Sequence, residues 1–254
     1  MLTNIFDTHA HYDDEDFDAD RFETLDEVFR NGVCGVINCG CTVASSKASL
    51  ALAHRIDGVY AAVGIHPQNA SEETQASFDV IRQLSQDEKA VAIGEIGLDY
   101  HYDYTPKEMQ LDFFEKQLIL ANELDLPVIV HDREAHEDCV NLIMKHKPRG
   151  VMHCFSGSLE TAKQLIGIGF YIGLGGSVTF KNARKPAEVA AGIDLDRILL
   201  ETDCPYMAPV PLRGRRNRSD YIAYVAERIA ALRGIDPQAV VDAARDNTKR
   251  LFGV

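Results

Sequence analysis

"AVAIGEIGLD", residues 90–99, is a run of apolar residues and glycines that holds one carboxylate, Glu95, in its interior. The apolar residues do not alternate with polar ones, as they would in a strand with one face in water. A continuous run is typical of a parallel strand that is buried on both faces of its sheet. A carboxylate inside it is costly unless it is paired, hydrogen-bonded or bound to a metal. The segment therefore predicts a buried strand that carries either a metal ligand or a carboxylate with a structural partner.

Seven more segments of this type occur along the chain, with helical patterns between them. They cover residues 4–11, 32–39, 58–67, 126–133, 150–157, 169–176 and 197–205. Most intervals between them are roughly 20 to 40 residues, which suits one βα unit each. With no linker, repeat or low-complexity segment, we predict an α/β fold of one domain over residues 1–254, a (β/α)8 TIM barrel. The alternative is an open doubly wound sheet, but no G-x-G-x-x-G turn follows the first strand.

Three helices have sequence signals at an end. The pattern over residues 17–31 ends at Gly32. Thr105 is expected to cap the helix that Pro106 begins, with Glu108 completing a capping box. Asp236 and Pro237 are expected to open the last helix in the same way.

Composition limits the class of protein. Hydrophobic residues make up 46% of the 254 residues, which excludes a disordered chain. No apolar run reaches the ~18 residues of a membrane helix, and the start has no signal-peptide pattern, so we expect a cytoplasmic protein that does not bind membranes. We expect its six cysteines to be ordinary reduced thiols. A net charge of −13 disfavours general binding to nucleic acid, so any phosphate would need local positive charge.

Metal-ligating residue types lie where strands end, which is where barrel enzymes place their catalytic groups. His9 and His11 are two apart, so they share one face of the first strand. His131 and His153 hold equivalent places on the fifth and sixth strands. Any one of these imidazoles alone is more often a satisfied core residue than a ligand.

Two carboxylates, Glu201 and Asp203, follow the eighth strand and share a face. They would repel each other without a cation. Pairing with an arginine such as Arg197 or Arg133 is the structural alternative.

Taken together, the nitrogen and oxygen donors on these strands outnumber the ligands of one tetrahedral zinc. They suit two divalent ions ~3.5–4 Å apart with a shared ligand, and Glu95 is the natural bridge. Zn, Mn or Ni fit this donor set, whereas Mg would have to accept unusually many imidazoles. The predicted metal ligands are His9, His11, Glu95, His131, His153 and Asp203.

The sequence resembles the TatD family of metal-dependent hydrolases, from residue 5 to the C-terminus. The resemblance is carried by "DTHAH", "GIHP", "GEIGLDY", "PVIVHDR", "HCFSG", "GLGG" and "LETDCPYMAPVPLRGRRN". It implies a divalent-metal-dependent phosphodiesterase, usually described as a deoxyribonuclease, with 3′–5′ exonuclease activity in some members.

The resemblance also assigns roles to residues. It implies that His9, His11, Glu95 and Asp203 hold one metal, and that Glu95, His131 and His153 hold the other. It places His66 near substrate, makes Glu201 a support of the site, and lets Arg133 hold phosphate or orient a ligand. Asp7 matches no ligand position and is expected to form hydrogen bonds only.

We expect the ions to activate a water that attacks phosphorus, with Glu95 and Asp203 as the catalytic carboxylates and Asp203 accepting the proton. Strand ends or short oligomers are the expected nucleic-acid partners. Oligomeric state is open, and a monomer is compatible with the sequence. The alternatives are an amide or ester hydrolase of the same barrel type, including a D-aminoacyl-tRNA deacylase, and a non-enzymatic metal-stabilised scaffold.

Three further segments are candidates for substrate contact. The loop of residues 213–218, where the family usually has Arg-Gly-Lys-Arg-Asn-Glu, carries Arg213, Arg215, Arg216 and Arg218, and either binds phosphate or is a solvated loop. Residues 173–176, "GLGG", either admit a phosphate or form a tight turn. Tyr100, Tyr102 and Tyr104 alternate after Glu95 and either contact bases or belong to a packed or solvent-facing loop.

Overall fold

The computed structural model describes residues 1–254 and contains one eight-stranded sheet. All neighbouring strands pair in parallel, in the order of the chain from β1 to β8. The strands are β1 Ile5–Ala10, β2 Val33–Cys39, β3 Val59–Val63, β4 Ala90–Asp99, β5 Val128–Arg133, β6 Gly150–Met152, β7 Tyr171–Leu174 and β8 Ile198–Leu200. Each lies within a segment expected to be a strand, so the TIM barrel is confirmed. Every residue of β4 is buried, as its continuous apolar pattern predicts.

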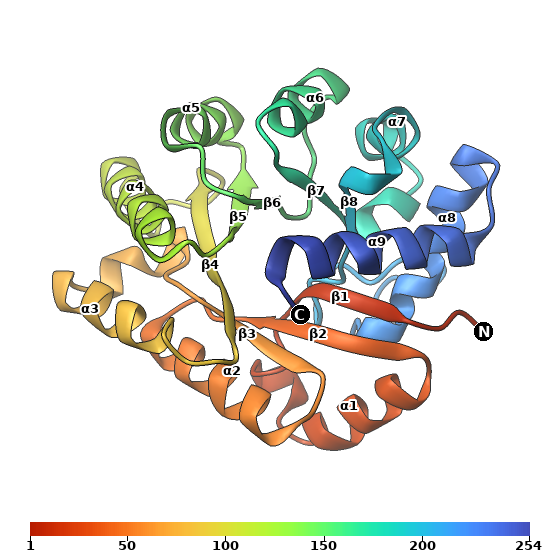
Figure 1. Cartoon of the computed structure of the whole chain (residues 1–254), viewed down its shortest axis with the longest axis horizontal. Coiled ribbons are helices and arrows are strands. Elements are labelled where there is room, and N and C mark those ends of the chain that lie inside the picture. The colour runs from red at the N-terminus through yellow and green to blue at the C-terminus, as the bar shows by residue number, and fades with distance from the viewer.

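Helices separate the strands and surround the sheet (Figure 1). They are α1 Arg21–Arg30, α2 Val43–Arg55, α3 Gln75–Leu84, α4 Lys107–Leu124, α5 His136–His146, α6 Leu159–Gly167, α7 Arg184–Gly192, α8 Ile222–Arg233 and α9 Pro237–Phe252. Short 3-10 turns add η1 Glu15–Phe17, η2 Pro67–Glu72, η3 Gly176–Thr179, η4 Leu195–Arg197 and η5 Ser219–Tyr221. No helix has the length and apolar character that a membrane crossing requires.

The buried apolar side chains form two clusters, one between the strands and the surrounding helices and one inside the barrel. The larger one joins 55 buried residues from strands and helices. The smaller one consists of 12 buried residues, all from strands except Leu251 and Phe252 at the end of α9. The barrel interior is therefore a packed core, and α9 supplies two of its side chains.

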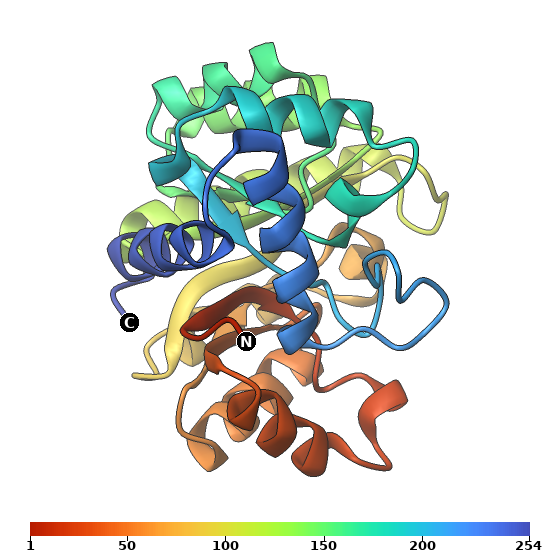
Figure 2. The same ribbon diagram turned by 90° about the vertical axis from the view of Figure 1, so that its right-hand side faces the viewer.

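The barrel closes between β1 and β8 at one end only. Ala10, the last residue of β1, forms an isolated parallel bridge with Cys204 in the segment that follows β8. Beside it, the His11 backbone N–H donates to the Cys204 carbonyl at 2.8 Å, and the Asp203 N–H donates to the His9 carbonyl at 2.9 Å. Closure thus places Asp203 next to His9 in β1 and His11 just after it. The segments that follow β1 and β8 extend to the same side of the molecule (Figure 2).

The helix signals are confirmed at the end of α1, which stops just before Gly32, and at the start of α9, but not at the start of α4; the first helix begins at Arg21 rather than at residue 17. Asp236 caps α9 by accepting the Gln238 N–H at 2.8 Å. The expected cap at Thr105 does not form, because its hydroxyl donates to the Gln68 carbonyl at 3.1 Å instead. Pro106 is the residue before α4, and no side chain caps this helix.

Candidate metal centre

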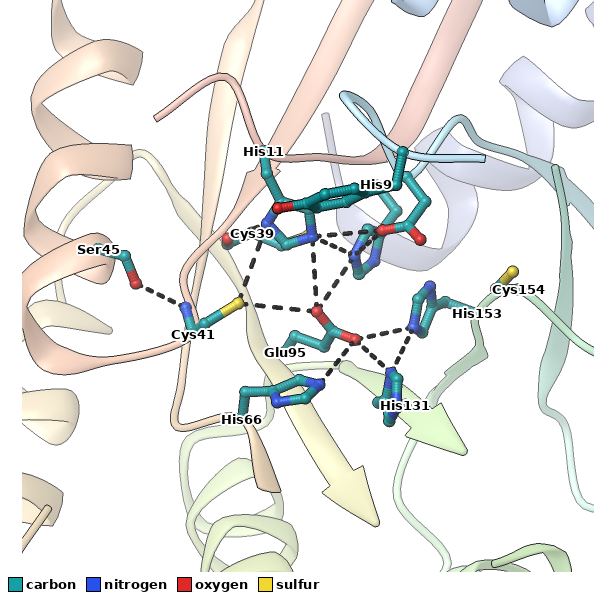
Figure 3. A network of polar contacts seen from close by, with 12 residues as sticks. His9, His11, Cys39, Cys41, Ser45, His66, Glu95, His131, His153 and Cys154 are labelled. Carbon is teal, nitrogen blue, oxygen red and sulfur yellow. Dashed lines mark hydrogen bonds and ion pairs between the residues drawn. The ribbon is translucent and has the colours of Figure 1, made fainter. Parts of the chain in front are cut away.

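The buried carboxylate of Glu95 lies between two groups of imidazoles (Figure 3). Oε2 is 3.3 Å from His9 Nε2 and 3.6 Å from His11 Nε2. Oε1 is 2.8 Å from both His131 Nδ1 and His153 Nε2. One carboxylate therefore faces a separate set of nitrogen donors with each oxygen, which is the geometry a shared ligand needs.

Asp203 completes the first of these two sets. Its Oδ1 is 3.6 Å from His9 Nε2 and 3.4 Å from His11 Nε2, and these nitrogens are themselves 3.0 Å apart. The second set contains His131 Nδ1 and His153 Nε2, 3.3 Å apart. His66 Nε2 approaches the same Glu95 oxygen at 3.7 Å. The structure thus brings together all six predicted metal ligands, from β1, β4 and β5 and from the residues that follow β1, β6 and β8.

The donor set fits divalent cations. Every charged partner within 4.0 Å of Glu95 and of Asp203 is a histidine, and no lysine or arginine reaches them. The alternative in which Arg133 or Arg197 pairs with Glu201 and Asp203 is not what the structure contains, because the only charged partners of these two carboxylates are histidines. Imidazole nitrogens and carboxylate oxygens converging in a buried space are the usual ligands of Zn and its neighbours in the first transition row.

The pKa values in the cluster show that its carboxylates are stabilised by nearby positive charge. Burial alone would raise the pKa of Glu95, yet the surrounding histidines, His153 and His9 first, hold that pKa well below its usual range. Burial also opposes charge on His131, but hydrogen bonds to Asp99 and Glu95 raise its pKa to about 10. Without metal, protons on imidazole nitrogens balance the carboxylates. A divalent cation would take the place of such protons at the same atoms.

Hydrogen bonds on the far side of two imidazoles fix their orientation. His11 Nδ1–H donates to the Cys39 carbonyl at 2.9 Å, and His131 Nε2–H donates to Asp99 Oδ2 at 3.2 Å. Each bond leaves the other ring nitrogen directed at the cluster. Such partners commonly orient metal-binding histidines and set their tautomer.

Comparison with known proteins identifies the family of this chain. The family model "TatD related DNase" matches residues 6–253. The chain belongs to the TatD-related DNase family. It is therefore a TatD-family metal-dependent hydrolase, as the resemblance in its motifs implies.

Individual TatD relatives cover the whole chain. The uncharacterized metal-dependent hydrolase YabD of Bacillus subtilis is 42% identical, over 98% of this chain and 99% of that protein. The 3′–5′ ssDNA/RNA exonuclease TatD of Salmonella typhimurium is 33% identical over 98% of this chain and 99% of that protein. The crystal structure of the Escherichia coli TatD homologue YJJV superposes with a TM-score of 0.94 at 34% identity, covering 100% of both chains.

A pocket of 660 Å³ opens over the candidate metal centre. Its lining includes His66 and Arg133, which were expected to be near substrate, and Asp203. The Asp203 side chain is 21% exposed, whereas that of Glu95 is only 4% exposed. Asp203 is therefore the carboxylate of the pair that is open to solvent. Burial lowers the pKa of His66 to about 3, so this imidazole is neutral.

Glu201 lies behind the centre rather than in the pocket. It is fully buried, its Oε1 accepts the Cys154 backbone N–H, and the same oxygen is 3.9 Å from His153 Nδ1. Burial raises the pKa of Glu201 to about 8. A Cβ on Gly173 would lie 2.4 Å from Glu201 Oε2, so the first glycine of "GLGG" makes room for this carboxyl group. This close packing accounts for Gly173 without a phosphate.

The basic loop does not line the pocket. Arg216 donates to both carboxylate oxygens of Asp20, at 2.7 and 2.6 Å. Arg218 pairs with Glu27 at 2.8 Å and with Asp220 at 2.7 Å. Arg213 donates to the Ala208 carbonyl at 3.1 Å and lies over the Phe180 ring, and Arg215 is exposed with no side-chain partner. The arginines thus mainly fasten this loop to neighbouring segments.

Sequence reasoning did not identify two residues at the centre. Cys41, after β2, has its Sγ 3.9 Å from Glu95 Oε2. Asp99, the partner of His131, lies four residues after Glu95 on β4. The even spacing along one strand is a signal that would have found Asp99. As expected, Asp7 forms hydrogen bonds only, from Ser219 Oγ and Thr202 Oγ1 at 2.6 Å each.

Proposed function

We propose that this chain is a divalent-metal-dependent phosphodiesterase that removes nucleotides from the 3′ end of single-stranded nucleic acid, most simply DNA. The observation that carries the proposal is the Glu95 carboxylate, whose two oxygens face two separate donor sets. The proposal also draws support from the TatD relative of Salmonella typhimurium, which is named a 3′–5′ ssDNA/RNA exonuclease.

The proposal assigns each donor set one ion. His9, His11, Glu95 and Asp203 would hold the first, and Glu95, His131 and His153 the second. When bound, the ions supply Lewis acidity toward a phosphoryl oxygen and lower the pKa of water to near neutrality.

The protein groups then divide the remaining tasks. Glu95 holds both donor sets together and stays ionised, because the histidines keep its pKa low. Burial raises the pKa of Asp203, which faces the pocket, but the hydrogen bond from His11 together with the positive charge of the nearby histidines lowers it, so the carboxylate remains ionised. Its carboxylate is therefore placed to accept the proton of the attacking water. Arg133 and neutral His66 line the same pocket and would orient the phosphodiester.

The test is hydrolysis by purified protein with Mg, Mn or Zn supplied separately. The substrates are single-stranded DNA and RNA of defined sequence, duplex DNA, and an acyl ester. The proposal expects mononucleotides to be released from the 3′ end of single strands in the presence of at least one of these metals. Hydrolysis of the acyl ester alone would favour the amide or ester hydrolase and overturn the proposal. A bound metal without an open coordination position would favour the scaffold.

A further inference from the structure

Two tyrosine rings form a stack at the edge of the metal pocket. The centroids of Tyr102 and Tyr104 are 5.3 Å apart, and the ring planes differ by 6°. Tyr102 is 40% exposed and Tyr104 is 71% exposed. Both rings line the pocket that contains Glu95. Two parallel aromatic rings are thus left open to solvent beside the candidate metal centre.

The stack is joined to the metal centre through Arg133. The guanidinium carbon of Arg133 is 5.0 Å from the centre of the Tyr102 ring, and Nη1 donates to the Tyr102 hydroxyl at 3.5 Å. Arg133 is the last residue of β5, two positions after His131. The aromatic stack therefore contacts a cation that lies on the same strand as His131, one of the candidate metal ligands.

The third tyrosine of this segment has a different environment. Tyr100 donates its hydroxyl to Asp138 at 2.8 Å, and the Lys107 ammonium lies 4.1 Å from its ring centre. It does not line the metal pocket. Packing thus accounts for Tyr100 but leaves the exposed stack of Tyr102 and Tyr104 without a structural partner on its outer side.

We propose that Tyr104, supported by Tyr102, is a stacking platform for an unpaired nucleobase of the substrate, with Arg133 contacting the adjoining phosphate. This inference rests on the proposed function for its substrate class. Stacking on an aromatic face is a common way to bind single strands without reading their sequence. It also suits a chain of net charge −13, in which contacts to many phosphates are unfavourable. A base inside a duplex is already stacked on both sides, so the platform favours single-stranded ends.

Binding is tested with a short single-stranded DNA that carries the fluorescent base 2-aminopurine at its 3′ end. A phosphorothioate at the last linkage slows cleavage, and the metal-loaded protein is titrated in. Stacking on Tyr104 quenches the base, and Tyr104→Ala is expected to weaken binding about tenfold and to remove the quenching. Tyr104→Phe keeps the ring and restores both. Tyr100→Phe is the matched control and is expected to bind as the wild type does.

A second DNA, with the terminal base removed to leave an abasic sugar, measures the contribution of the base. The wild type is expected to prefer the intact DNA about tenfold, and Tyr104→Ala is expected to lose this preference. Equal binding of the two DNAs by the wild type, no binding at all, or equal affinity of wild type and Tyr104→Ala would overturn the platform. Quenched binding by the wild type without cleavage of the unmodified DNA would support the platform and refute the nuclease activity.

Discussion

The candidate metal centre and the loop of residues 213–218 both gather charged side chains near the ends of barrel strands. The two regions differ in the residues that pair with these side chains. At the centre, the only charged partners of Glu95 and Asp203 are histidines. In the loop, Arg216 and Arg218 are paired with carboxylates of other segments. Divalent cations can therefore replace imidazole protons at the centre, whereas most of the loop's charge is balanced by fixed carboxylates. The two clusters of charged residues thus differ in whether their side chains are available to a ligand.

Glu95→Gln is expected to have the largest effect, because it removes the charge that serves both donor sets while keeping the size of the side chain. The ions would then stabilise the transition state less well by several kcal/mol, which corresponds to a fall in kcat of about a thousandfold or more. Elemental analysis and hydrolysis rates measure the two losses. If two ions stay bound and hydrolysis keeps the wild-type rate, Glu95 is not the bridge.

Asp203→Asn is expected to lower kcat by about 10²–10⁴-fold, because the amide cannot accept the proton of the attacking water. The second donor set does not include Asp203, so at least one ion should remain bound. Steady-state kinetics and metal counting on the same sample separate the two roles. A variant that hydrolyses substrate normally would assign the proton to another group.

Asp99→Asn is expected to have a smaller effect, because Asp99 acts on the metal only through His131. Loss of such an orienting partner typically weakens metal affinity about 10–100-fold. Competition with a chelator of known affinity measures the change. The same substitution at Asp138, which accepts from Tyr100 away from the pocket, is the control and should leave metal affinity unchanged. Equal affinity in the wild type and both variants would remove Asp99 from the account.

Substitutions in the loop of residues 213–218 are expected to change the stability of the fold. Arg216→Ala should reduce the free energy of unfolding by about 0.5 kcal/mol, since its pair with Asp20 is partly exposed and screened. The hydrogen bond from Arg216 lowers the pKa of Asp20, so its contribution is present above the unfolded pKa of about 3.9 and is lost as the pH falls through the lower folded value. In denaturant titrations, the difference in stability between wild type and variant should therefore be smaller at pH 3 than at pH 7. Unpaired Arg215→Ala is the matched control, and a large loss of stability there would contradict this view of the loop.

Sequence patterns were sufficient for the barrel and for the convergence of the ligand residues. Parallel strands in chain order bring their carboxyl ends to one side, so residues as distant as His9 and Asp203 could be placed together before any contact was known. The partners of Arg216 could not be found in this way. Asp20 is almost 200 positions away, and nothing in either local sequence favours that pair over a solvated loop.

Local rules also failed where a tertiary contact competed with them. Thr105 has the residue type and spacing of a helix cap, but a carbonyl of η2 accepts its hydroxyl. Cys41 was grouped with ordinary thiols because no spacing pattern marks it. Its sulfur lies near Glu95 because the residues after β2 contact β4, where the Glu95 N–H donates to the Gly40 carbonyl at 2.8 Å.

The most direct test of the account is an anomalous-diffraction map of crystals of the wild-type protein loaded with manganese or zinc. The account predicts two peaks, one beside each oxygen of Glu95, with His9, His11 and Asp203 around one peak and His131 and His153 around the other. A single peak, or peaks that do not contact Glu95, would contradict the central claim that this carboxylate joins two metal sites.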